Sequence, residues 1–116
     1  MSDEQENFID KDELIKSFEV ILNELNSLGD WNFSNATKLN RLNSKRHSFA
    51  GDMIELGLET GTSWAYSTDE TDREIYIAQE TRPKKKKDLI FHESNYHKGI
   101  RHLRDEIQQY IDKLKE

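Results

Sequence analysis

The sequence predicts an α+β domain, in which three amphipathic helices pack on a small three-stranded antiparallel β-meander in the order ααβββα. Residues 12–28, 34–58 and 94–115 repeat their apolar side chains every three or four positions, which is the helical period. The segment between the second and third of these changes to a period of two and is rich in β-branched and aromatic residues, which favours strands. The alternative is an all-helical bundle, because short apolar runs fit either structure.

The length of 116 residues predicts one domain. We expect residues 1–10 to form a flexible acidic N-terminus and residues 11–116 to form the single compact α+β domain. The chain has no cysteine, which excludes disulfides and thiolate metal sites. Its acidic start does not resemble a secretory signal, and no stretch approaches the roughly 20 apolar residues of a membrane span. We therefore expect a cytoplasmic protein with no membrane partner.

The first helix is expected to start after Asp10, with Glu13 completing a capping box and Gly29 as the left-handed residue beyond its end. Its apolar stripe is Leu14, Phe18, Ile21, Leu25 and Leu28. The stripe of this helix faces the predicted core.

The second helix places an arginine in its apolar stripe, which consists of Leu39, Leu42, Arg46, Phe49, Met53 and Leu56. A buried guanidinium would need carboxylate partners and would mark a structural ion pair or an anion site. The sequence favours the other interpretation, in which the stem of Arg46 covers apolar surface and its charged head reaches water at the edge of the bundle. Gly57 and Gly61 mark the end of the helix.

The third helix carries a seam spaced by four and three residues, which consists of Tyr96, Ile100, Leu103, Ile107, Tyr110 and Leu114. This spacing favours nearly parallel helix packing, either within the chain or in a homodimer built through residues 94–115.

The strands are predicted at residues 63–67, 74–79 and 88–92, with Thr81 to Lys87 as one connection. A helix begun at Ser67 or Thr71, each followed three residues later by glutamate, is the alternative for the first part of this segment. If the segment forms strands, Tyr76 lies on the face of the sheet that points away from the helices, and that face is suited to protein binding.

The net charge is −6, and the acidic residues concentrate in residues 1–30 and 52–80 while the basic residues concentrate in 31–51 and 81–104. A bipolar charge layout of this kind steers association with oppositely charged partners. We expect a small acidic non-catalytic protein of the inhibitor, immunity or adaptor type, associated with a phage or toxin system, that binds and neutralises a macromolecular partner with a basic surface. The expected partner-binding residues are Asp52, Glu55, Glu59, Asp69, Glu70, Asp72 and Tyr76.

The alternative function is nucleic-acid binding through the basic helix at residues 38–46 and a lysine-rich loop. Lys38, Arg41 and Lys45 share one helical face, and the loop residues are Lys84, Lys85, Lys86 and Lys87. The same lysine run is also typical of a solvated turn between two strands.

Catalysis, metal binding and cofactor binding are not expected. Asp52, Glu55 and Glu59 lie on one side of the second helix, but no matching acidic motif occurs on the third helix and no glycine-rich phosphate loop is present. Three histidines, His92, His97 and His102, are spaced by five residues, which prevents them from converging on one ion on a helix.

Overall fold

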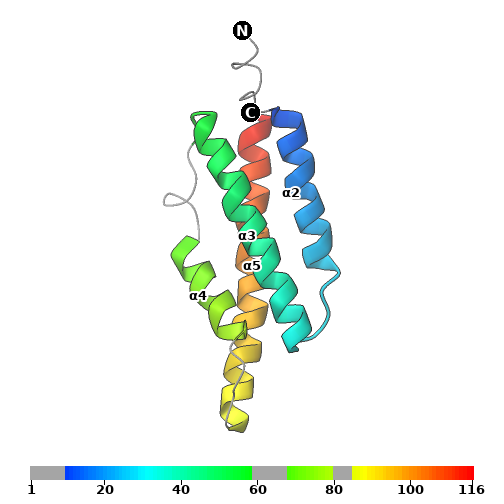
Figure 1. Cartoon of the computed structure of the whole chain (residues 1–116), viewed down its shortest axis with the longest axis vertical. Helices are drawn as coiled ribbons and strands as arrows, with labels where there is room; N and C mark the ends of the chain where they lie inside the picture. The colour runs from blue at the N-terminus through cyan, green and yellow to red at the C-terminus, as the bar shows by residue number, and fades with distance from the viewer. Residues whose placement is uncertain (1–9, 59–67, 80–84) are drawn as a thin grey trace.

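The computed structural model describes residues 10–58, 68–79 and 85–116, and it forms four helices in these ranges. They are α2 (Lys11–Asn26), α3 (Phe33–Glu55), α4 (Thr68–Gln79) and α5 (Lys86–Lys115). Consecutive helices run in opposite directions, as in an up-down-up-down bundle (Figure 1). The short helix α4 packs against α3 and α5 but not against α2, so the bundle has three long helices and one short one.

The predicted three-stranded meander is wrong, and the all-helical alternative is correct for the described ranges, where no strand occurs. Residues 74–79 belong to α4 and residues 88–92 to α5, while residues 63–67 lie outside the described part of the chain. Without the meander, the α+β description of the single domain at residues 11–116 is also wrong. Residues 1–9 lie outside the described part of the chain.

The buried stripe of α4 explains the error. Its members are Thr71, Glu74, Ile75 and Ala78, at helical spacing, and two of the four are polar. A search for apolar periodicity therefore misses the helical stripe and finds the alternation of Ile75 and Ile77 with other residues instead. α4 begins at Thr68, close to the starts that the helical alternative proposed.

The lysine run is partly helical rather than a loop between strands. Lys86 and Lys87 lie in the first turn of α5, and Lys85 is the residue before it. The backbone N–H of Lys85 donates to Asp88 Oδ2 at 3.1 Å, which fixes the start of the helix. Lys84 lies outside the described residues.

The observed ends of α2 and α3 agree in part with the ends that the sequence predicts. Asp10 is the N-cap of α2, and its Oδ1 accepts a hydrogen bond from the N–H of Asp12 at 2.9 Å. The prediction for Gly29 is wrong, because α2 ends at Asn26 with Ser27 as its cap, and Gly57 is the only described residue with positive φ. Gly57, at φ 81°, follows the end of α3 as predicted.

The predicted seam of the last helix is confirmed as core. Tyr96, Leu103, Ile107, Tyr110 and Leu114 are buried, and Ile100 packs against them. Phe18 of α2 is fully buried, and its ring centre lies 5.2 Å from that of Tyr110 and 5.7 Å from that of Phe49. The seam is thus covered by other helices of the same chain.

Three hydrogen bonds attach the α2–α3 connection and the start of α5 to their neighbours. The hydroxyl of Tyr96 donates to the carbonyl of Gly29 at 2.8 Å. The indole Nε1 of Trp31 donates to the carbonyl of Ala78 at 2.8 Å, and Nδ1 of His92 lies 2.7 Å from the carbonyl of Ile77. Because a carbonyl only accepts, His92 carries a proton on Nδ1. The Trp31 and His92 donors satisfy carbonyls at the C-terminal end of α4 that have no partner within the helix.

Candidate functional site

Polar side chains meet where α3, α4 and α5 pack together, and because most of them are buried we call this group the buried polar network. Its members are Asn43, Arg46 and His47 of α3, Thr71, Asp72 and Glu74 of α4, and His102 and Glu106 of α5. Among the described residues it contains six of the eight buried polar or charged side chains, so it is the main departure of the core from apolar packing.

Arg46 lies at the centre of the buried polar network with 1% of its surface exposed. Its Nη2 donates to Oδ1 of Asn43 at 2.6 Å and to Oδ1 of Asp72 at 3.0 Å. Its Nη1 lies 3.6 Å from Oε2 of Glu106. The prediction that this guanidinium reaches water is wrong: the side chain is buried because two carboxylates and an amide surround it, as the structural ion-pair interpretation required.

Glu106 is as buried as Arg46 and receives a hydrogen bond from Oγ1 of Thr71 at 2.7 Å. Burial raises the pKa of Glu106 above its ordinary value, and this outweighs the lowering by the Thr71 hydrogen bond and the Arg46 charge. Oε2 of Glu106 and Nε of Arg46 are buried and make no hydrogen bond. The pair therefore interacts by charge across 3.6 Å rather than by a close bidentate contact.

Asp72 connects the buried polar network to the surface. Burial alone would raise its pKa, but hydrogen bonds with Asn43 and His47 and the charges of His47 and Arg46 outweigh burial, so the pKa of Asp72 is lowered. Nε2 of His47 lies 2.8 and 3.0 Å from the two oxygens of Asp72, and both side chains are partly exposed. Asp72 was expected to face a partner, and in the structure its carboxylate is used within the chain.

A second buried pair lies on the same side of α4. Nδ1 of His102 is 2.7 Å from Oε1 of Glu74, and both residues are buried. Together with the contacts of Arg46 and Glu106, this pair fixes α4 to the rest of the bundle. The charged side chains of the buried polar network therefore pair with one another within the chain, and this geometry indicates a structural role.

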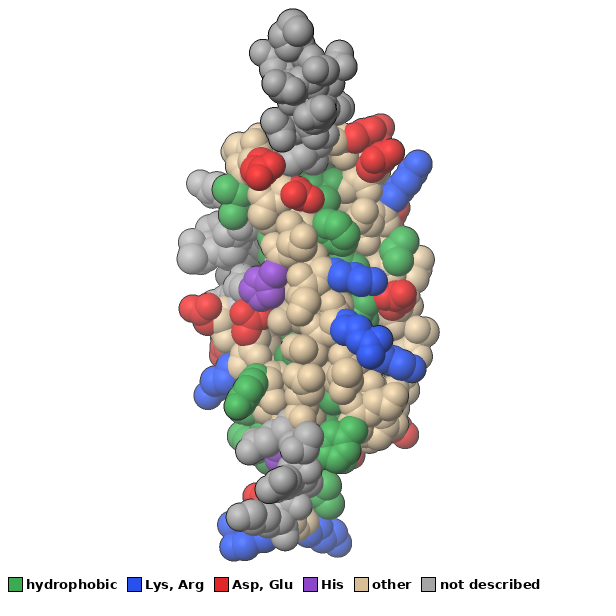
Figure 2. All heavy atoms as spheres, viewed as in Figure 1, with side chains coloured by type: hydrophobic (Ala, Val, Ile, Leu, Met, Phe, Trp, Pro, Cys, Tyr) green, Lys and Arg blue, Asp and Glu red, His purple; other side chains and the backbone are tan. Residues whose placement is uncertain are grey.

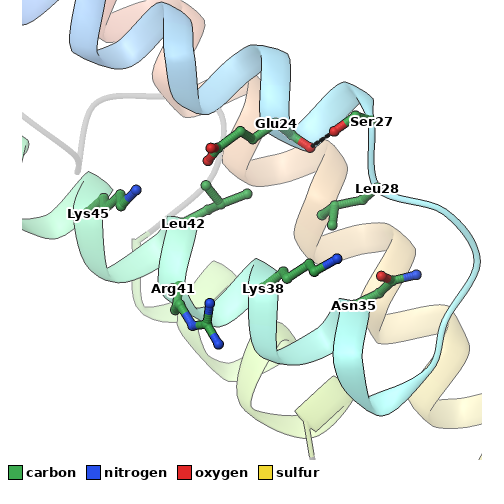
Figure 3. A pocket seen from close by; sticks show the side chains of 8 residues that line it. All are labelled: Glu24, Ser27, Leu28, Asn35, Lys38, Arg41, Leu42 and Lys45. Atoms are coloured by element: carbon green, nitrogen blue, oxygen red, sulfur yellow. Dashed lines mark hydrogen bonds between the residues drawn. The ribbon is translucent and has the colours of Figure 1, made fainter.

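A pocket of about 370 Å³ lies between the end of α2 and the first half of α3 (Figure 3). We call it the basic pocket. It is lined by Glu24, Ser27, Leu28, Asn35, Lys38, Arg41, Leu42 and Lys45. The structure thus brings together Lys38, Arg41 and Lys45, the three helical residues of the predicted nucleic-acid site. All three are exposed.

The N-terminal end of α5 projects beyond the other helices (Figure 1). Leu89, Ile90 and Phe91 are 42%, 64% and 55% exposed there, and they follow the exposed residues Lys85, Lys86 and Lys87. We call these six residues the projecting tip. Figure 2 shows Lys and Arg side chains at this lower end of the molecule and acidic side chains at its upper end.

The predicted acidic partner-binding residues that the structure describes lie on two helices, α3 and α4. Asp52 is half-buried and Glu55 is exposed near the end of α3, whereas Asp69 and Glu70 are exposed in the first turn of α4. Tyr76 is 72% exposed on α4, although the sheet that was expected to present it does not exist. Glu59 lies outside the described residues.

Sequence reasoning missed the projecting tip and most of the buried polar network. The signal for the network was Arg46 itself, because it occupies a stripe position between Leu42 and Phe49. The signal for the tip was the direct adjacency of three apolar residues, which the strand assignment turned into a half-buried alternation.

Among the residues that the structure describes, no group of three or more His, Asp or Glu side chains is placed to hold a metal ion. In the described part of the chain, no helix has both the length and the hydropathy of a membrane-spanning segment. No family model, curated protein or solved structure matches the chain.

Proposed function

We propose that the chain is a non-catalytic cytoplasmic binding protein that docks onto a protein partner through the projecting tip. The observation that carries the proposal is the exposure of three consecutive large apolar side chains, Leu89, Ile90 and Phe91, at the end of α5 that extends beyond the bundle. Large apolar side chains that gather on a surface mark protein-binding sites, whereas single exposed ones are ordinary.

The lysines of the projecting tip define the chemistry of the partner. Lys85, Lys86 and Lys87 are exposed beside the apolar residues. A partner that covers the apolar side chains brings its own surface against these three charges, so a rim of carboxylates around an apolar depression would complement the tip. The partner surface that we propose is therefore acidic at this contact, in contrast to the basic surface expected from the sequence.

The test compares apolar substitutions at the tip with one elsewhere. Ile90→Ser and Phe91→Ser together should reduce retention of the partner at least about tenfold, because buried aromatic and aliphatic anchors dominate interface energies. Val20→Ser is the matched control, since Val20 is 53% exposed on α2. Partners are captured from the native host, identified by mass spectrometry, and titrated as purified proteins by calorimetry. Equal affinity of the partner for the tip variant and the control would exclude this docking site.

Replacing Lys85, Lys86 and Lys87 by serine tests the charge complementarity. Rim charges act mainly on association, so the association rate with the purified partner should fall and lose most of its salt dependence, while dissociation changes little. An unchanged association rate would show that these lysines are solvated residues at the start of α5 that do not contribute to binding.

The exposed carboxylates offer the alternative surface of the same function, directed at a basic partner. If they carry the contact, Glu55→Gln and Asp69→Asn should weaken capture of the partner, and the tip variants should not. The two sets of variants therefore separate an acidic partner from a basic one.

Nucleic-acid binding is the second candidate function, and the gathering of Lys38, Arg41 and Lys45 on one side of α3 favours it. A salt titration with duplex and single-stranded DNA and RNA measures it. Tight binding that weakens steeply with salt would support it, and undetectable binding at low salt would remove it.

A further inference from the structure

The basic pocket concentrates positive charge in a chain whose net charge is negative. Three cations and a single carboxylate, that of Glu24, line it. Lys38 and Arg41 are three residues apart and Arg41 and Lys45 are four apart, so the like charges are neighbours on the helix surface and repel one another. An arrangement of this kind favours a ligand that carries more than one negative charge.

The cations of the basic pocket are available to a ligand. Within the described ranges, none of Lys38, Arg41 and Lys45 forms a salt bridge, and neither does Glu24. Acidic side chains of α2 therefore form no ion pair with this basic face in the described ranges. Two other polar groups of the pocket are already used, because Oγ of Ser27 donates to the carbonyl of Glu24 and Nδ2 of Asn35 donates to the carbonyl of Asp30. The lysines and the arginine are thus the donors that remain for an anion.

The walls of the basic pocket are held by helix ends. Ser27 is the C-cap of α2, and Asn32 is the N-cap of α3, with its Oδ1 accepting from the N–H of Asn35 at 2.8 Å. Leu28 and Leu42 supply apolar lining between these two ends. Figure 3 shows Lys38, Arg41 and Lys45 on successive turns of α3, with Glu24, Ser27 and Leu28 across from that helix on α2 and the residues after it.

We propose that the basic pocket binds a small phosphate-bearing ligand of the nucleotide class. Lysine and arginine are the side chains suited to phosphate, and arginine can contact it through two N–H groups at once. The volume of about 370 Å³ is in the range of small-molecule sites, and Leu28 and Leu42 provide apolar surface for a base or a similar ring. The site is independent of the projecting tip, so it does not depend on the proposed docking function.

Isothermal titration calorimetry at low salt tests the proposal with ATP, AMP, inorganic pyrophosphate and a short single-stranded oligonucleotide as probes. ATP should bind more tightly than AMP, because it brings more charge, and more tightly than pyrophosphate, because pyrophosphate has no ring. Lys38→Gln, Arg41→Gln and Lys45→Gln should each weaken ATP binding, and the triple variant should abolish it.

Two further variants separate the basic pocket from general attraction to positive charge. Glu24→Gln removes the carboxylate of the pocket and should tighten ATP binding by about two- to fivefold, the range for exposed charge pairs. Lys115→Gln changes the charge by the same amount as each pocket variant, at an exposed residue at the opposite end of the bundle, and should have no effect. Circular dichroism confirms that each variant remains helical.

Several results would overturn the proposal. Absence of binding heat at millimolar ATP, or an equal loss of affinity in Lys115→Gln, would show that the pocket is not a ligand site. Pyrophosphate binding as tight as that of ATP would exclude nucleotides as the preferred ligand class, because the base would then contribute nothing. Oligonucleotide binding much tighter than ATP, with a steep salt dependence, would assign the three cations to nucleic-acid backbone contact instead.

Discussion

Arg46 lies where α3, α4 and α5 meet, and its guanidinium balances the carboxylates of Asp72 and Glu106. Removing one partner of a buried ion pair costs more than the pair contributes, because the remaining charge stays in an apolar surrounding. The consequences of single substitutions in the buried polar network therefore depend on which charges remain.

Arg46→Met should lower the free energy of unfolding by about 3–5 kcal/mol, the usual cost of leaving buried charges without their partner. Arg41→Met, an exposed position on the same helix, should change it by less than about 0.5 kcal/mol. Adding Glu106→Gln to Arg46→Met should recover part of the loss, since the two residues are coupled. Urea denaturation measures all three variants. Additive losses in the double variant would show that Arg46 and Glu106 do not interact.

The two titrating carboxylates of the network give opposite pH dependences. The lowered pKa of Asp72 means that its stabilising contribution is lost as the pH falls below its ordinary value of 3.8 and passes through the folded pKa. The raised pKa of Glu106 means that the folded state holds its proton more tightly than the unfolded state. Stability associated with Glu106 is therefore lost as the pH rises from its ordinary value of 4.5 through the folded pKa.

Glu106→Gln removes the second of these contributions. The melting temperature of this variant relative to the unsubstituted chain should increase as the pH rises from about 4 to about 7, because only the unsubstituted chain loses a proton from this buried carboxyl. Thermal melts across this pH range measure the difference. Parallel profiles would indicate that Glu106 titrates as it does in water.

At the scale of elements, Gly99 of α5 packs closely against Ile75 of α4. A Cβ added at this glycine would lie 2.9 Å from Cγ1 of Ile75 and 3.6 Å from Cδ2 of Leu39. Ile75 is β-branched and buried in α4, so its Cγ1 cannot move away without shifting the helix. The glycine at this position is required by helix packing.

Gly99→Ala should therefore lower the free energy of unfolding by about 1–3 kcal/mol, the usual cost of overpacking a core. Gly51→Ala is the matched control, because Gly51 is exposed in α3 and an added Cβ would meet no atom within 4 Å. This control should raise stability by up to about 1 kcal/mol through helix propensity. Urea denaturation of both variants gives the comparison, and stabilisation by Gly99→Ala would contradict the close packing.

The elements that the sequence predicted correctly are those whose buried stripes are mostly apolar. The buried stripe of α2 contains only Leu, Phe and Ile, and the second half of α5 buries Leu, Ile and Tyr side chains beside His102 and Glu106, so the apolar periodicity of both helices agrees with the structure. α4 and the first turns of α5 bury Thr71, Glu74, His92 and Asn95 and leave Ile90 in solvent. Apolar periodicity cannot detect a helix that is buried on polar residues, because the partners that make their burial favourable come from distant parts of the chain.

The candidate sites, like the helices, could be predicted from the sequence only in part. The helical spacing of Lys38, Arg41 and Lys45 predicted their common side of α3, but the pocket also needs the end of α2, whose position depends on tertiary packing. The involvement of Asp72 with Arg46 and His47 joins residues 25 and 26 positions apart, which no local pattern reports.

At the scale of the whole molecule, the chain covers its own apolar seam. Tyr96, Leu103, Ile107, Tyr110 and Leu114 of α5 are buried against other helices of the same chain, so this seam offers no surface to a second copy. A homodimer built on this seam, one of the two packings that the sequence left open, would require the bundle to open.

Light scattering of the purified chain should accordingly give a mass of about 13.7 kDa at high protein concentration. Phe91→Ser should give the same mass, because the tip is proposed to meet a different protein. A mass twice as large would indicate self-association, and its loss in Phe91→Ser would assign the projecting tip to a second copy of the chain.

The polar contacts of α4 also determine its position along the bundle axis. Apolar surfaces fit one another at several places that differ by one helical turn, about 5.4 Å, because side chains recur at that interval. The hydrogen bonds from Thr71 to Glu106 and between Glu74 and His102 can form in only one alignment of α4 with α5. A shift of α4 by one turn would break both bonds and leave two buried carboxylates without partners. The same residues that hide α4 from sequence analysis thus give it a single register.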